Sequence, residues 1–195
     1  MSPVMESTLK AVAGQGQATL AEQRYAAAES VPQLKFEALF VRYAPYVASI
    51  GLRLLGRRDE IDDLVQDVFL EAHRGLHRLK DPWAVKGWLA TITVRLAGRR
   101  LRRRKLAHRL GWRQTDADYE NIAGRGASPE QRLHIARVYQ ALDRLPVKQR
   151  MPWVLRFIEG ESLEQITKTC GISRATAYRR IAAAHEAIRR EVGHG

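Results

Sequence analysis

Apolar residues recur at steps of three and four along most of this chain, which is the period of α-helices that bury one face. The first stripe starts at Phe36, and Pro45 is expected to end or kink its first turns. Gly56 offers a stop before a second stripe that begins at Ile61, and a third follows a predicted loop at 75–82. Because no segment alternates apolar and polar residues as a strand does, the pattern predicts an all-α fold.

Two stretches lack this period. Residues 1–30 are rich in small and polar residues, so we expect a flexible N-terminal arm. From residue 112 to 129 the chain turns to Asp, Asn, Gly, Ser and Gln, a composition typical of a linker, and a second helical block starts near Glu130. The sequence therefore predicts two small helical domains joined by a flexible linker. The expected divisions are the arm at 1–30, a helical domain at 31–105, the linker at 106–130 and a second helical domain at 131–195.

The second block carries a helix-turn-helix pattern. Ser162, with Gln165 three residues on, fits a capping box at the start of one helix. Gly171 stands where a helix end favours a left-handed residue, and Ser173 can cap the basic helix that follows. In a helix-turn-helix, this second helix places its N-terminal residues in the major groove of DNA. An ordinary helical hairpin with an arginine-rich face is the alternative.

Composition narrows the function classes. The 195 residues include 33 Lys or Arg and 21 Asp or Glu, a formal charge of +12, which favours a polyanionic partner. The single cysteine, Cys170, excludes an intramolecular disulfide and a Cys-rich zinc module, and its apolar position predicts a buried structural role. We expect no membrane insertion, because no apolar run approaches the length of a spanning helix.

The charges are segregated within the first domain. Six acidic residues and no Lys or Arg lie from Asp59 to Glu71, and nine Lys or Arg and no acid lie from Arg95 to Arg113. Phosphates repel an acidic helix, so a protein that only contacts nucleic acid gains nothing from it. Solvated surfaces are the plain alternative, but the separation favours two partners, a basic protein surface and a nucleic-acid backbone. Four acidic residues share one helix face: Glu60, Asp63, Asp67 and Glu71.

Catalytic and metal-binding patterns are weak. The acidic face invites a Mg²⁺-dependent nuclease, yet no second carboxylate set converges on it. His73 and His77 have the spacing of a zinc pair but lack the glutamate of HExxH and an evident third ligand. No Walker loop, GxGxxG or GxSxG is present. We therefore expect no enzyme activity, no metal and no cofactor.

Two segments together resemble a known family. Residues 62–70 (DDLVQDVFL), followed by Trp88-Leu89 and an arginine-rich helix end, resemble the second conserved region of sigma-70-family factors. Residues 142–146 (LDRLP), with Arg150 and then the helix-turn-helix, resemble the fourth region. Their close spacing, with no third-region domain between them, is similar to the extracytoplasmic-function (ECF) subfamily.

The resemblance implies a role for each set of residues. The family's polymerase-binding helix matches Asp62, Asp63, Gln66 and Asp67. The part of the family that captures and follows the −10 strand matches Lys80, Trp83, Arg95, Arg99, Arg102 and Arg103. The recognition helix facing the −35 element matches Ser173, Arg174, Thr176, Tyr178, Arg179 and Arg180. A core position for Trp83 is an equal alternative to stacking on a flipped base.

The implied function is that of a promoter-specificity subunit in the bacterial cytoplasm. Its partners would be core RNA polymerase, promoter DNA and, by family habit, an anti-sigma factor. Two alternatives remain, a stand-alone helix-turn-helix regulator and a sigma-like protein that sequesters polymerase without initiating. The chain departs from the family at Arg95 and Arg99, where Asn and Asp are common, and at Pro152, which implies a late start or a kink in its helix.

Overall fold

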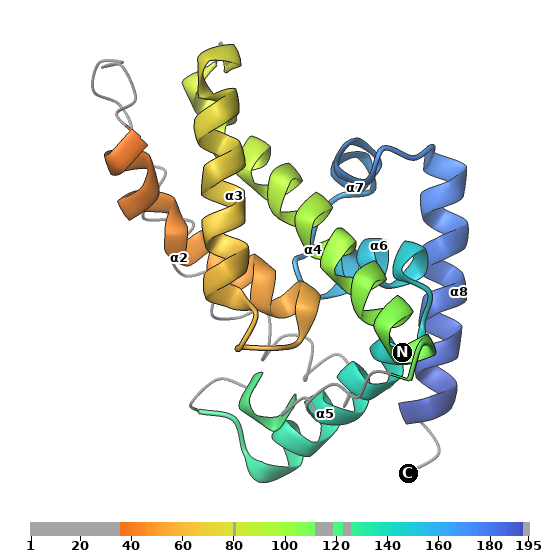
Figure 1. The fold of residues 1–195 in the computed structure, drawn as a ribbon. Helices are drawn as coiled ribbons and strands as arrows, with labels where there is room; N and C mark the ends of the chain where they lie inside the picture. The colour runs from red at the N-terminus through yellow and green to blue at the C-terminus, as the bar shows by residue number, and fades with distance from the viewer. Residues whose placement is uncertain (1–35, 80, 112–118, 123–125, 193–195) are drawn as a thin grey trace.

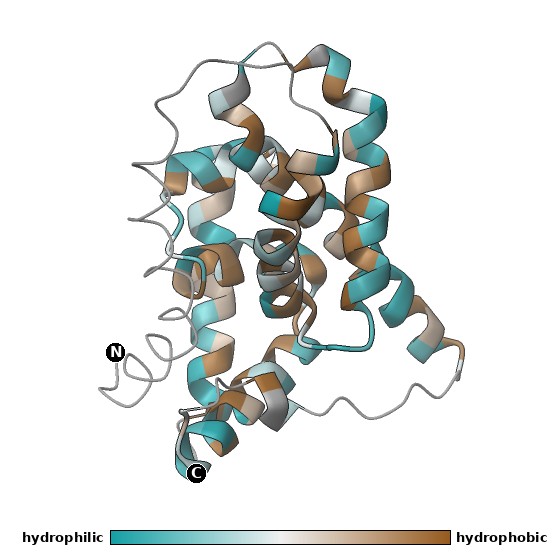
Figure 2. Ribbon diagram, turned by 90° about the vertical axis from the view of Figure 1, so that its left-hand side faces the viewer, coloured by the Kyte–Doolittle hydropathy of each residue, from teal (hydrophilic) through white to brown (hydrophobic). Residues whose placement is uncertain are grey.

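The computed structural model describes residues 36–79, 81–111, 119–122 and 126–192. The predicted arm at 1–30 and the predicted DNA contact Lys80 lie outside these residues. Within them the chain forms α-helices and short 3-10 helices and no strand, so the all-α prediction is confirmed. Most helices carry both hydrophilic and hydrophobic residues along their length, as amphipathic helices do (Figure 2).

The first three described helices form one bundle, called the first bundle below. It consists of α2 (Phe36–Leu55), α3 (Ile61–Gly75) and α4 (Val85–Arg109), each packed against the other two (Figure 1). The predicted loop between α3 and α4 contains two short 3-10 helices, η1 (Leu76–Arg78) and η2 (Pro82–Ala84). Its long central helix, α4, also reaches the rest of the molecule, because it contacts α6 and α7.

The second bundle begins within the segment predicted as a linker, at 106–130. A 3-10 helix, η3 (Tyr119–Ile122), packs on α5 (Pro129–Arg144), and Ser128 caps α5 with a capping box. The remaining helices are α6 (Val147–Phe157), α7 (Leu163–Cys170) and α8 (Arg174–Val192). The longest of them, α8, lies along both α5 and α6 (Figure 1).

Neither of the two internal prolines ends its helix or delays its start. The helix α2 runs unbroken through Pro45, and α6 starts directly after Pro146 with Pro152 inside it. A proline inside a helix removes one backbone hydrogen bond, but the burial of the apolar side chains that follow outweighs that cost. Val47 and Val154, which follow the two prolines, are fully buried.

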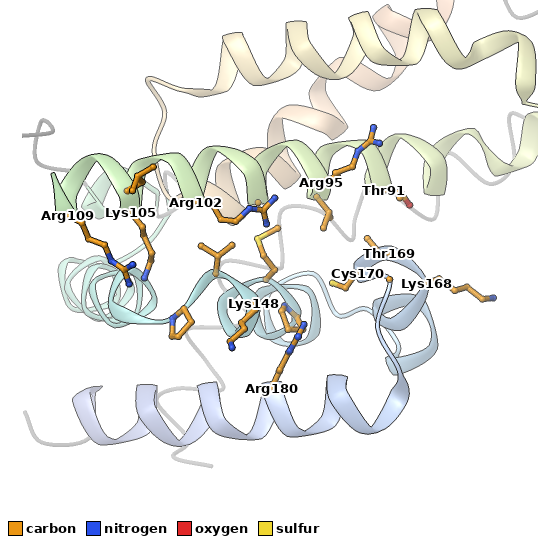
Figure 3. Close-up of a pocket in the computed structure, with 18 residues that line it drawn as sticks. Thr91, Arg95, Arg102, Lys105, Arg109, Lys148, Lys168, Thr169, Cys170 and Arg180 are labelled. Atoms are coloured by element: carbon orange, nitrogen blue, oxygen red, sulfur yellow. The ribbon is translucent and has the colours of Figure 1, made fainter. Parts of the chain in front are cut away.

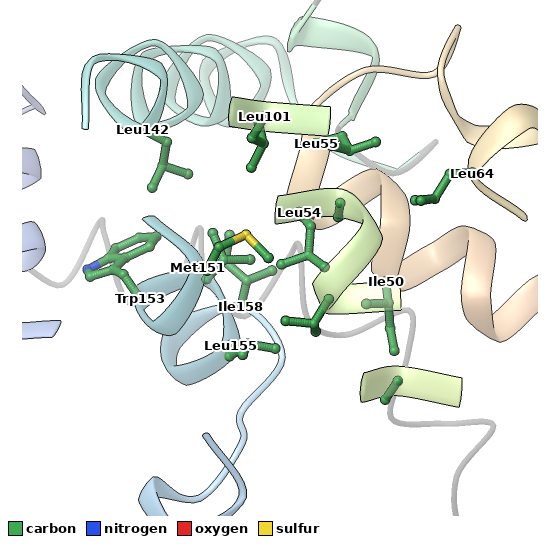
Figure 4. Close-up of a cluster of buried hydrophobic side chains, with 14 of the residues drawn as sticks. Ile50, Leu54, Leu55, Leu64, Leu101, Leu142, Met151, Trp153, Leu155 and Ile158 are labelled. Atoms are coloured by element: carbon green, nitrogen blue, oxygen red, sulfur yellow. The ribbon is translucent and has the colours of Figure 1, made fainter. Parts of the chain in front are cut away.

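The apolar stripe of α2 is used by the core. Among the described helices, α2 alone has the length and composition of a membrane span. Its buried side chains, Leu39, Val47, Ile50, Leu54 and Leu55, belong to the hydrophobic core, which accounts for its apolar character. The same cluster continues into the second bundle through Leu142 and Trp153 (Figure 4). The two bundles therefore share one core, and we call this contact between them the closed arrangement.

Polar groups of the second bundle complete the end of α2. The last carbonyls of a helix have no partner within it and must find one elsewhere. The hydroxyl of Tyr139 donates to the carbonyl of Arg53 at 3.0 Å. The guanidinium of Arg150 donates twice to the carbonyl of Leu54, at 3.2 and 2.9 Å. Gly56, at φ +69, ends the helix against Tyr139, where an added Cβ would come within 2.7 Å of the ring.

Arg150 is the central residue of this contact. It is fully buried on α6, and its guanidinium also pairs with Asp143 of α5. A second ion pair, between Arg53 of α2 and Glu159 after α6, joins the bundles with one nitrogen–oxygen distance of 2.8 Å. A buried guanidinium is favourable only when its donors are satisfied, so this interface fixes the position of α6 against α2.

We predict that Arg150→Met lowers the free energy of unfolding by about 3–5 kcal/mol, because Asp143 and the Leu54 carbonyl lose their donor in a buried site. Urea unfolding followed by circular dichroism measures this change. The exposed Arg137 of α5 provides the control, since Arg137→Met should stay within about 0.5 kcal/mol of the unaltered protein. A loss as small as that of the control would contradict the closed arrangement in solution.

Cys170 ends α7 in a half-buried position against the core. Burial raises the pKa of its thiol from 9.0 to about 11, although Arg180 acts in the opposite direction. The reactive species is the thiolate, so a raised pKa protects this cysteine at neutral pH.

We predict that iodoacetamide alkylates Cys170 far more slowly in the folded protein than in the urea-unfolded chain. At pH 8 the raised pKa leaves about 0.1% thiolate, roughly a hundredfold less than an unperturbed thiol. Mass spectrometry of timed samples measures the two rates. Equal rates would mean that the thiol is not buried.

Candidate polymerase-binding and nucleic-acid interfaces

The predicted polymerase-binding residues lie together on the outer face of α3. Asp62, Asp63 and Gln66 are exposed, and Asp67 is exposed one turn further on. The opposite face of the helix carries Leu64 and Val68, which are fully buried against the first bundle. The apolar spacing thus fixes the rotation of α3 and turns the acidic side outward.

The acidic and basic faces of the first bundle are not separate surfaces. Three members of the predicted acidic face pair with arginines of α4, and such ion pairs restrain both side chains. The pairs are Glu60–Arg104 at 2.6 Å, Asp67–Arg100 at 2.5 Å and Glu71–Arg95. The two charged helix faces that the sequence predicts are therefore joined by ion pairs. Among the described residues, Asp62 and Asp63 form no ion pair, so they carry the free negative charge of α3.

Trp83 lies in η2, before α4, and its side chain is 70% exposed. Its backbone N–H donates to the Asp81 carboxylate at 2.9 Å, which fixes the turn. A position in the core, the alternative for this residue, is wrong. Trp88, one turn into α4, is partly buried against the core and contacts Gly75 at the end of α3. Of the two tryptophans, Trp83 alone offers its ring to a partner.

The predicted −10 arginines of α4 are brought together only in part. Arg99 and Arg103 are exposed, and among the described residues they form no ion pair. Arg95 is exposed and turned to Glu71 of α3. Arg102 is exposed and lines a cavity between α4 and the second bundle, where its side chain lies along α4 (Figure 3). The closed arrangement therefore places two of the four, Arg95 and Arg102, at the cavity beside the second bundle.

The helix-turn-helix forms with the predicted caps, except that the capping box at Ser162 is incomplete, because the Gln165 side chain donates to Thr169. The Ser162 hydroxyl accepts from the backbone N–H of Gln165 at 3.1 Å, and Gly171 ends α7 in the left-handed conformation at φ +63. The Ser173 hydroxyl accepts from the backbone N–H of Thr176 at 3.3 Å and so caps α8. Ala177 is fully buried and anchors α8.

The predicted −35 residues divide between two faces of α8. Arg174, Tyr178 and Arg179 are exposed, and Tyr178 exposes 70% of its surface. Thr176 is half-buried and bonded to Ser173. Arg180 is also half-buried and points toward α6 (Figure 3). The exposed, outward set is therefore Arg174, Tyr178 and Arg179.

Sequence reasoning missed the cavity that Arg102 and Arg180 line together. It has a volume of about 710 Å³ and lies between α4 and the helices α6 to α8. Helical periodicity assigns a residue to a face of its own helix, but it does not say which helix of another bundle lies opposite. Among the described residues, no group of three or more His, Cys, Asp or Glu side chains is placed to hold a metal ion.

Family comparisons match one region in each bundle. The description "Sigma-70 region 2" matches residues 39–107, and "Sigma-70, region 4" matches residues 135–188. The first range covers most of α2 to α4, and the second runs from within α5 to within α8. The two matched regions thus correspond to the two structural units.

Curated relatives agree with these matches. The chain is 34% identical over 160 residues to the ECF RNA polymerase sigma factor SigM of Mycobacterium tuberculosis, which covers 82% of this chain and 78% of SigM. It is 31% identical over 158 residues to the ECF RNA polymerase sigma factor SigE of Mycolicibacterium smegmatis, which covers 79% of this chain. That match spans 60% of SigE, less than two thirds of its length.

A solved structure has the same fold. The sigma factor RpoE from Bartonella quintana, in complex with the anti-sigma factor NepR, superposes with a TM-score of 0.62 at 21% identity. The superposition covers 81% of this chain and 96% of RpoE. Both sigma regions, in order and on separate bundles, together with relatives above 30% identity, show that this chain belongs to the ECF subfamily of the sigma-70 family.

Proposed function

We propose that this chain is a promoter-specificity subunit that binds core RNA polymerase and directs transcription initiation. The observation that carries this function is the presence, on one chain, of an exposed carboxylate and amide face on α3 and an exposed basic helix-turn-helix on α8. A regulator that binds only DNA does not need the acidic face of α3, and a protein that binds only other proteins does not need the basic helix-turn-helix. Such a subunit acts without a catalytic group, and its place is the bacterial cytoplasm.

In this proposal each surface has its own partner. Asp62, Asp63 and Gln66 meet a basic surface of the polymerase, since Asp67 is already paired with Arg100. Arg174 and Arg179 face the −35 element, where guanidinium groups bond to guanine edges or phosphates. The shape of the −35 DNA also contributes to its recognition, because bending and groove width depend on the base sequence.

Melting of the −10 element falls to the end of α4 and the turn before it. Extruding a base costs a few kcal/mol of unstacking, which an aromatic ring can offset. The exposed ring of Trp83 is suited to this stacking. Arg99 and Arg103 then neutralise phosphates of the strand, which makes binding dependent on salt.

Binding to both elements requires the bundles to separate. The elements lie some 25 base pairs apart, about 85 Å along B-DNA. A compact chain of this length has a radius of gyration of only about 16 Å. The closed arrangement therefore represents the chain away from the promoter, and its contacts at Arg150 and Arg53 must break when both elements are bound.

An anti-sigma factor is the regulatory partner that we infer. The support is the likeness in fold to RpoE, which was solved with the anti-sigma factor NepR. A partner of that class would act on the closed arrangement, since this is the form that does not span a promoter.

Run-off transcription by purified core polymerase, with and without this protein, on a library of promoter fragments tests the function. Discrete start sites that depend on the protein support it, and the sequences upstream of them give both elements. Co-purification with polymerase but no start sites would favour a sequestering protein. Neither start sites nor association would return the case to a stand-alone regulator.

We predict that Asp63→Lys weakens binding to core polymerase by about tenfold or more, because it places a cation against a basic surface. Asp63 forms no ion pair among the described residues, so the fold should be unaffected. Glu130→Lys on α5 makes the same charge change elsewhere and serves as the control. Binding is measured by fluorescence anisotropy of labelled protein. If both variants bind like the unaltered protein, α3 is not the contact.

We predict that Arg174→Ala with Arg179→Ala weakens initiation that depends on the −35 element by roughly 1–3 kcal/mol for each lost base contact. Arg189→Ala, further along α8 and paired with Glu186, is the matched control. Footprinting and run-off transcription on a promoter with and without its −35 element measure the effect. An unchanged footprint would mean that another face of α8 reads the DNA.

A further inference from the structure

The cavity between the bundles is lined from both sides. Its walls come from α4 of the first bundle and from α6, α7 and the start of α8 of the second (Figure 3). A volume of about 710 Å³ lies within the range of small-molecule sites. The cavity exists only while the bundles are in contact, so whatever binds in it binds the closed arrangement.

The charge of this cavity has one sign. Of the 18 residues that line it, seven are Lys or Arg and none is Asp or Glu. Figure 3 shows Lys105 and Arg109 extending from α4 toward the second bundle and Arg102 lying along α4, with Lys148 and Arg180 on the side of the second bundle. The other two basic residues already have partners, since Arg95 pairs with Glu71 and Lys168 with Glu164.

Four of the cations have no counter-charge. Among the described residues, Arg102, Arg109, Lys148 and Arg180 form no ion pair. The neighbouring amine of Lys105 donates to the carbonyl of Leu145. Its pKa is lowered by burial and by the positive charges of Arg150 and Arg109. Like charges held together in this way are relieved by an anion placed between them.

The remaining lining suits a compact anion and adds an apolar wall beside it. Guanidinium groups bind phosphate oxygens through paired hydrogen bonds, and Thr91 and Thr169 add hydroxyl groups. Val94, Leu106 and Met151 supply apolar wall. We propose that this cavity binds a small polyphosphate anion, inorganic or part of a nucleotide, and that the bound anion bridges the two bundles.

Bridging has a functional consequence that rests on the proposed function. A ligand that binds only the closed arrangement stabilises it by RT ln(1 + [L]/Kd). That free energy opposes the separation of the bundles on a promoter. Polyphosphate would therefore keep the protein from initiating transcription, with Arg102, one of the predicted −10 contacts, engaged by the ligand.

Isothermal titration calorimetry of the full chain at physiological salt tests the site, with sodium tripolyphosphate, ATP and orthophosphate as probes. We expect one molecule of tripolyphosphate or ATP to bind per chain and orthophosphate to bind much more weakly, because it meets fewer cations. Tighter binding of ATP than of tripolyphosphate would identify a nucleotide, and equal binding would identify the phosphates alone.

Variants on each side of the cavity test the bridge. Arg102→Ala and Lys148→Ala should each weaken tripolyphosphate binding by about tenfold, and both side chains are exposed, so the fold should persist. The control Arg74→Ala with Arg137→Ala removes two exposed cations far from the cavity and should change affinity less than about twofold.

Three results would overturn the proposal. The first is that tripolyphosphate does not bind at physiological salt. The second is that the control variant loses as much affinity as the cavity variants, which indicates unspecific attraction. The third is that only one of Arg102→Ala and Lys148→Ala loses affinity, which means that the anion does not bridge the bundles. Binding of an acidic peptide in the cavity, without binding of polyphosphate, would overturn the proposal in the same way as the first result. Neither polymerase nor promoter DNA is present, so these outcomes are independent of the test of transcription initiation.

Discussion

The structure depends on how the last carbonyls of α2 find their hydrogen-bond donors. Tyr139 and Arg150 of the second bundle supply them, and Arg104 of α4 donates to the carbonyl of Leu55 at 3.3 Å. A helix end buried without donors would be strongly unfavourable. The first bundle is therefore completed by the second, and the apolar core that spans both follows from this contact. When the bundles separate, water replaces the donors Tyr139 and Arg150, whereas Arg104 stays with α2.

The helices could be predicted from the sequence because each has a clear apolar face. The helix ends at Ser162, Gly171 and Gly56 could also be predicted, because caps and helix stops depend on neighbours in the chain. That the helices continue through Pro45 and Pro152 could not be predicted in this way, because long-range burial decides whether a helix continues through a proline. The ion pairs between α3 and α4 could not be predicted from the sequence either. Charge runs read along the chain do not reveal which helix lies opposite.

The candidate interfaces show the same division. Outward residues on a single helix, such as Asp63 on α3 and Arg179 on α8, follow from periodicity alone. The positions of residues near the edge of a face do not follow from it. Arg102 and Arg180, on different bundles, line the same cavity. Trp83 had two equal readings, and only the exposure of its ring decided between them. Contacts between bundles thus determine which of the basic residues remain open to a partner.

The buried guanidinium of Arg150 also affects how the separated bundles behave in water. A contact made of apolar side chains alone would leave two adhesive surfaces once opened, and such surfaces favour aggregation. Here the exposed patch would include a fully charged arginine, its carboxylate partner Asp143 and several carbonyls, all of which hydrate well. The polar centre therefore lowers the tendency of the separated bundles to aggregate.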